Sequence, residues 1–123
     1  MSDSDLLHLK ALVALDALHR GNGTSALLAS LGHNLIVSEC LCVAGYEKER
    51  MTAVREGHAA LVRVDMKSEE TGRWEAEDGD YAALRAAVEV YGAQLSLAPR
   101  AEIRKAQLDM VGVLTKFWPQ KAA

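Results

Sequence analysis

Apolar residues recur every three or four positions through most of the chain, a spacing that predicts amphipathic helices. In the longest apolar run, Leu31 to Ala44, Glu39 carries the one permanent charge. A helix that is apolar on nearly all sides is surrounded by other helices. We therefore expect this run to form the second half of a central helix, with His33 and Asn34 as its buried polar residues.

Glycine, proline and capping residues divide the chain into five expected helices. Thr24 and Asp80 are suited to cap the second and fourth helices, Gly45 and Gly72 to end the second and third, and Pro99 cannot continue the fourth. The predicted ranges are about residues 5–20, 25–44, 47–71, 80–97 and 99–117. Because the connections are short, the sequence predicts an all-α fold, a compact antiparallel bundle of four to five helices.

Length and composition agree with one helical domain spanning residues 1–123. Half of the residues are apolar and aromatic residues are few, as is typical of packed helices. A chain of this size buries roughly two-thirds of its unfolded surface, enough to fold without staples. Its first apolar segment has no basic residues before it and is interrupted by His8, Lys10 and Asp16, which fits neither a signal peptide nor a membrane span. We expect a cytoplasmic protein that does not contact a membrane.

Cysteine and histidine are the residues most often used to bind metals, but their spacing here argues against such a site. Cys40 and Cys42 point about 200° apart on a helix, so they neither bridge each other nor chelate one ion together. His58 falls on an apolar stripe and has apolar residues three and four positions further on, which favours a core histidine. We expect no metal and no cofactor. A bundle that holds a ligand or metal among His33, Cys40 and His58 remains an alternative.

Local spacing assembles no catalytic group. The chain has no pair of histidines four residues apart, no Glu-x-x-His, no Cys-x-x-Cys and no serine cradled by glycines. We therefore expect a protein that is not an enzyme, and we assign no catalytic residue.

Charge is distributed unevenly along a chain whose net charge is −3. Residues 69–80 contain six acidic residues and one basic residue, a net −5, whereas residues 97–123 contain five basic and two acidic residues, a net +3. Opposite charge would let the acidic loop dock on the last helix, within one chain or across a dimer. Trp74 lies among these acids, either folded over the bundle or presented to a partner. The expected interaction site consists of Arg73, Trp74, Glu75 and Glu77.

The basic start of the last helix is the alternative site. Arg100, Arg104 and Lys105 would offer a small patch for nucleic-acid phosphates. The net acidity and the lack of helix-turn-helix spacing make nucleic acid the less expected partner.

The segments ALDALHRGNGT, TGRW and EVYGAQLSLAPRAEIRKAQ follow one another along the chain. This succession resembles a family of short helical proteins encoded in phages and prophages of proteobacteria, over about Leu12 to Leu114. The family has no established activity, so the resemblance implies a mobile-element accessory protein and transfers no functional residue. We therefore expect a regulatory or host-modulating protein that binds an unidentified host or phage protein, with a homodimer as a further option.

Overall fold

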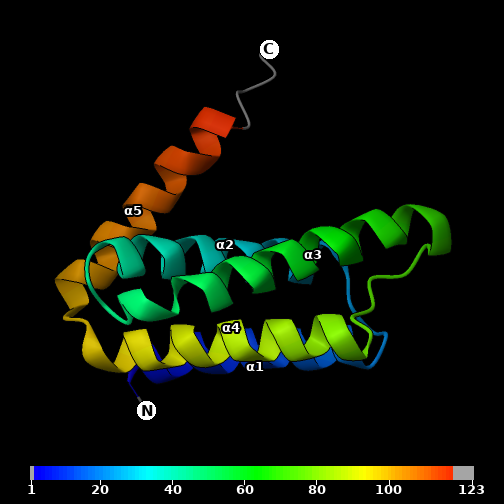
Figure 1. Ribbon diagram of the computed structural model, residues 1–123, viewed down its shortest axis with the longest axis horizontal. Helices are drawn as coiled ribbons and strands as arrows, with labels where there is room; N and C mark the ends of the chain where they lie inside the picture. Colours follow the sequence, from blue (N-terminus) through cyan, green and yellow to red (C-terminus); the bar gives the residue numbers. More distant parts are fainter. Residues whose placement is uncertain (1, 118–123) are drawn as a thin grey trace.

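The structure is a computed structural model that describes residues 2–117, and it is an all-α bundle. Within these residues lie five α-helices and one short 3-10 helix. They are α1 (Asp3–His19), α2 (Ser25–Val43), η1 (Lys48–Arg50), α3 (Met51–Thr71), α4 (Asp78–Leu97) and α5 (Arg100–Phe117). The helices α1 to α4 run antiparallel in succession and close into a bundle, whereas α5 leaves the bundle at an angle (Figure 1). The predicted fold class is confirmed.

The ends of the first three helices follow from local hydrogen bonding. Ser2 Oγ accepts from the Asp5 amide and the Asp5 carboxylate accepts from the Ser2 amide, both at 3.1 Å, and these bonds lower the pKa of Asp5. Thr24 Oγ1 accepts from the Leu27 amide at 3.1 Å, as its sequence position predicts. Gly72 ends α3 with φ of 73°, a conformation that glycine adopts without steric cost.

The start of α4 differs from the prediction. The helix begins at Asp78, with Glu77 in the N-cap position and no side-chain capping bond. Asp80 is not the cap; its carboxylate accepts a hydrogen bond from Arg63 Nε on α3 at 2.8 Å. An acid in the first turn still interacts favourably with the helix dipole, so moving the boundary by two residues costs little.

The central position of α2 is confirmed, because α2 contacts each of the other four α-helices. The most extensive packing joins α3 to α4, where a Cβ on Gly57 would collide with the Cβ of Ala87. Gly57 therefore marks a close crossing of two helices. In contrast, α5 makes its main contact with α2. The four-helix core is thus complete without α5, which lies on the outer side of α2.

The buried polar residues of α2 differ from those expected. His33 is exposed, and Asn34 is half-buried with its Oδ1 accepting from the Tyr91 hydroxyl at 3.4 Å. Ser38 is the α2 side chain that reaches the polar centre of the core, where it meets Gln94 of α4. The prediction for His33 was wrong because its position on α2 faces away from α1 and α4.

By length and composition α2 could cross a membrane, with a mean hydropathy of 1.6 over its most apolar stretch. A core helix of a soluble bundle has the same properties, and one-third of that stretch is buried in the fold. This helix decides neither for nor against a membrane, so the cytoplasmic location stays a prediction.

Candidate functional site

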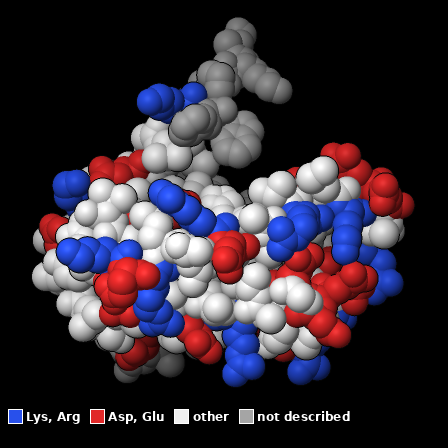
Figure 2. Space-filling model, viewed as in Figure 1, with Lys and Arg blue, Asp and Glu red and all other residues white. Residues whose placement is uncertain are grey.

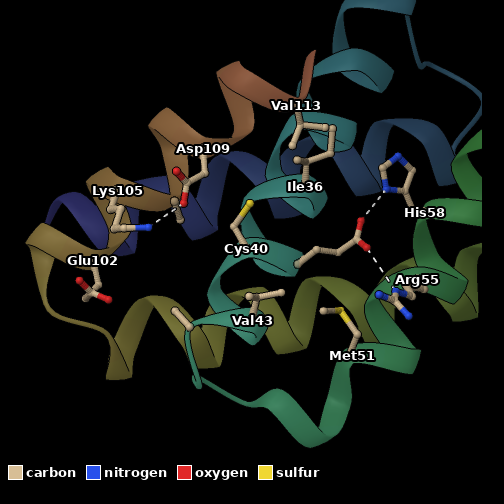
Figure 3. Close-up of a pocket in the computed structure, with 13 residues that line it drawn as sticks. Ile36, Cys40, Val43, Met51, Arg55, His58, Glu102, Lys105, Asp109 and Val113 are labelled. Atoms are coloured by element: carbon tan, nitrogen blue, oxygen red, sulfur yellow. Dashed lines mark hydrogen bonds and ion pairs between the residues drawn. The ribbon is translucent and has the colours of Figure 1, made fainter. Parts of the chain in front are cut away.

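A long hollow lies where α5 leaves the bundle. Two cavities of about 660 and 640 Å³ both have Ile36 and His58 in their linings, so they form one continuous groove, which we call the α2 groove. Figure 2 shows the surface dipping between α5 and the far end of α3. The floor comes from the outer face of α2, with α3 and α5 as the two walls (Figure 3). The floor residues are Leu28, Ala29, Gly32, Ile36, Cys40 and Val43.

The groove is open because α5 packs on α2 over its first half. Ile103 and Ala106 are buried there, whereas Met110 and Val113 are half-buried further along. Helical periodicity places these four residues and Phe117 in one row along α5. Among the side chains that the structure describes, the row is buried only at Ile103 and Ala106. The side chain of Phe117 lies outside the described ones. The cause is the direction of α5, which leaves the bundle at an angle (Figure 1).

The rim of the groove carries charges of both signs. Glu39 on α2 accepts from Arg55 Nε at 3.4 Å and lies 3.4 Å from His58 Nδ1, both on α3 (Figure 3). On the α5 wall Lys105 Nζ donates to Asp109 at 3.1 Å, which raises the pKa of Lys105. His58 was expected in the core. Instead one-third of its side chain is exposed, because the carboxylate of Glu39 holds it at the groove edge.

Both cysteines are free thiols; Cys42 is buried and Cys40 is half-buried. The Cys42 thiol donates to the Glu47 carbonyl at 3.5 Å and lies 3.1 Å from Gln94 Nε2. Cys40 is half-buried in the groove floor. Burial raises the pKa of both thiols, so both are weak nucleophiles at neutral pH.

The suggested ligand set is spread along the groove. His58 borders both of its cavities, Cys40 borders one and His33 the other. Within residues 2–117 no group of three or more histidines, cysteines and acids lies close enough to hold a metal ion.

The loop predicted as the interaction site is attached to the bundle. Trp74 is half-buried against the core and forms an isolated β-bridge with Gly23. Two residues further on, the Ala76 amide donates to the Leu18 carbonyl at 2.9 Å. The indole Nε1 of Trp74 is buried without a hydrogen-bond partner among the described residues. Of the two readings of Trp74, the structure shows the one in which the ring folds over the bundle.

The charged residues of this loop pair locally. Arg73 lies 3.2 Å from Glu75, and Lys67 Nζ donates to Glu77 at 2.9 Å. Acidic and basic side chains therefore alternate at this end of the molecule (Figure 2), while α5 begins at the opposite end (Figure 1). Within the described chain the acidic loop does not dock on α5. That Arg73, Trp74, Glu75 and Glu77 bind a partner stays a prediction.

The three bases of the alternative site do not form one patch. Arg100 Nη2 lies 2.8 Å from Asp3 on α1, in a separate hollow that Arg104 also lines. Lys105 faces the α2 groove and pairs with Asp109. Arg100 and Arg104, four residues apart, lie on one side of α5, whereas Lys105 points about 100° away from Arg104.

The groove could not be predicted from the sequence. It depends on the angle at which α5 leaves α2, and helical periodicity does not encode that angle. The available signal was an apolar surplus on the last helix, where Leu108 and Val111 lie off the row formed by Ile103, Ala106, Met110 and Val113 and are exposed in the structure.

The chain matches no protein-family model, no curated protein and no solved structure. The resemblance to the phage and prophage family stays a prediction.

Proposed function

We propose that the protein is a non-enzymatic phage or prophage accessory protein that acts by binding another protein, and that the α2 groove receives a helix of that partner. The observation that carries this proposal is the groove itself, an apolar channel on the central helix that the described residues leave uncovered. Contiguous exposed apolar surfaces mark sites of interaction. The phage assignment rests on the sequence resemblance alone.

The floor of the groove has the pattern of a helix-packing face. Leu28, Gly32, Ile36 and Cys40 follow one another at intervals of four and form a single ridge along α2. A Cβ on Gly32 would find its nearest neighbour 3.8 Å away, so there is room above the ridge. A partner helix would lay its apolar stripe along this ridge.

The rim would select the partner. An apolar centre surrounded by charged residues is the usual arrangement of a protein interface. The α3 wall offers Arg55, His58 and Asp65, and the α5 wall offers Lys105 and Asp109. Because both signs are present, the partner helix should be amphipathic with mixed charge rather than strongly basic or acidic.

The groove chemistry also supports a non-enzymatic role. Cys40 places a thiol, a nucleophilic group, in the floor of the groove. Burial raises the pKa of this thiol, so it is protonated and weakly nucleophilic at neutral pH. The charged pairs on the rim are ion pairs of opposite sign, which do not supply an acid and a base with separated pKa values.

Affinity capture from host lysate tests the proposal. Val62→Glu places a charge on the α3 wall of the groove, and Val13→Glu is the matched control on α1, because the two valines are 51% and 56% exposed. We expect the wild type and Val13→Glu to retain one stoichiometric protein after nuclease treatment, either an untagged copy of this chain or a different protein, and we expect Val62→Glu to lose it.

Two other results would assign the interaction to a different site or partner. If Val62→Glu keeps the partner, while Trp74→Ala with Glu75 and Glu77 replaced by glutamine loses it, the loop is the interaction site. If nuclease releases everything that was captured, nucleic acid is the partner and the groove proposal fails.

A further inference from the structure

We propose that the helix received by the α2 groove is the second half of α5 from a second copy of this chain, in a symmetric dimer. This inference rests on the proposed function, because it names the partner of the same groove. It commits to the outward side of residues 108–116, marked by Leu108 and Val111, as the inserted face. Asp109, Val113 and Leu114 on the other side line the groove of their own chain.

The two halves of α5 differ in their surroundings. In the first half Ile103 and Ala106 are buried against the bundle. In the second half Leu108 is 72% and Val111 53% exposed, one turn apart on the same side of the helix. Residues 110–115 carry no charge. A projecting helix with uncovered apolar side chains and a charge-free centre has the composition of an interface core.

The groove floor continues a surface that this chain already uses to bind α5. The first half of α5 covers the outer face of α2 near Cys40. The same face runs on past Ile36 to Gly32 and Leu28, where α5 has diverged and leaves it open (Figure 1). Because α5 diverges, one copy cannot cover both its open groove and its own projecting helix. A second copy supplies a helix for the open groove and a groove for the projecting helix.

The dimensions agree with this arrangement. Residues 108–116 span about 12 Å, and the ridge from Leu28 to Ile36 has the same length at 1.5 Å per residue. The dimer would cover the exposed side chains of Leu108, Val111, Val62 and Met66 together with the groove lining.

Symmetry closes the assembly. Each copy has one groove and one projecting α5. When α5 of each copy lies in the groove of the other, both grooves are occupied and no binding site is left for a third copy. The dimer would therefore be a discrete species and not a growing chain.

Sedimentation velocity on the full chain is the first test. We expect the wild type to sediment with the mass of two chains. Val111→Glu on α5 and Val62→Glu in the groove should each weaken dimerisation at least tenfold, with the helical circular dichroism retained. Val13→Glu, an exposed valine on α1, should change it less than twofold.

A mixture of the two interface variants tests the reciprocal geometry. The Val111→Glu copy keeps an intact groove and the Val62→Glu copy keeps an intact α5, so together they form one unmodified joint. We expect a heterodimer at concentrations at which neither variant associates with itself. Pairing of α5 with α5, or of groove with groove, gives no such complementation.

The outcomes separate this inference from the proposed function. A wild type that stays monomeric at all concentrations, a dimer that Val13→Glu dissociates, or a mixture without complementation overturns the dimer. If Val111→Glu, which keeps the groove, still captures a different protein that Val62→Glu loses, the proposed function stands without the dimer.

Discussion

Ser38 of α2 and Gln94 of α4 are joined by two hydrogen bonds in the centre of the core. Ser38 Oγ donates to Gln94 Oε1 at 2.5 Å, and Gln94 Nε2 donates to the Ser38 carbonyl at 3.0 Å. Both side chains are fully buried. Gln94 Nε2 also donates to the Tyr46 carbonyl at 3.0 Å, just beyond the end of α2. One amide therefore fixes the last turns of α2 against α4.

Gln94→Leu should destabilise the protein by about 2 to 4 kcal/mol, because it leaves the Ser38 hydroxyl and the Tyr46 carbonyl buried without their partner. Ser38→Ala should cost less, since one hydroxyl is removed and the other bonds of Gln94 persist. Urea unfolding measures both. The double variant should lose less than the sum of the single variants. Strict additivity would show that the two side chains act independently.

Two helical glycines should respond to alanine in opposite directions. Gly57→Ala places a Cβ against Ala87 and should cost about 1 to 3 kcal/mol through overpacking of α3 on α4. Gly112→Ala on α5 meets nothing within 4 Å and should stabilise that helix by up to about 1 kcal/mol. Thermal unfolding compares them. Recovery of stability in Gly57→Ala with Ala87→Gly would identify the contact, and no recovery would refute it.

Alkaline pH should destabilise the fold through Tyr91. Burial raises the pKa of Tyr91 to about 12. The unfolded tyrosine releases its proton near pH 10 and the folded one about two units later, so stability falls as pH rises across this interval, by about 2 to 3 kcal/mol. Urea unfolding between pH 9 and 12 checks this, with Tyr91→Phe as the control. An equally steep loss of stability in Tyr91→Phe would assign the effect to other groups.

Binding to duplex DNA should be weak and should not depend on Arg100, Arg104 and Lys105 acting together. Arg100 is paired with Asp3 and Lys105 with Asp109, and the two pairs line different hollows. Replacing all three by glutamine should leave fluorescence anisotropy with labelled duplex unchanged. A salt-sensitive affinity that disappears in the triple variant would restore the nucleic-acid alternative.

Helix positions could be predicted from the sequence because they depend on neighbours along the chain. Thr24, Gly72 and Pro99 set boundaries through their own backbone and side-chain chemistry, and the structure agrees. The apolar run of α2 also indicated a helix with neighbours on several sides. These signals are local, so no tertiary information was needed.

Features that depend on the relative placement of helices were not accessible. Choosing between His33 and Ser38 as the buried polar residue of α2 required knowing that Gln94 lies opposite Ser38. The groove required the direction in which α5 leaves α4 after Ala98, whose backbone is extended with ψ of 139°. Periodicity gives the face of a helix but not the angle to its neighbour.

The most direct test of the proposed dimer, in which the α2 groove receives α5 of a second copy, is amide hydrogen exchange of the full chain at concentrations below and above association. We predict that residues 108–116, the first half of α2 and the α3 segment around Val62 gain protection together, while α1 does not change. Protection that appears on α1 around its exposed Leu9 and Val13, or no concentration-dependent protection in the groove, would contradict the proposed dimer.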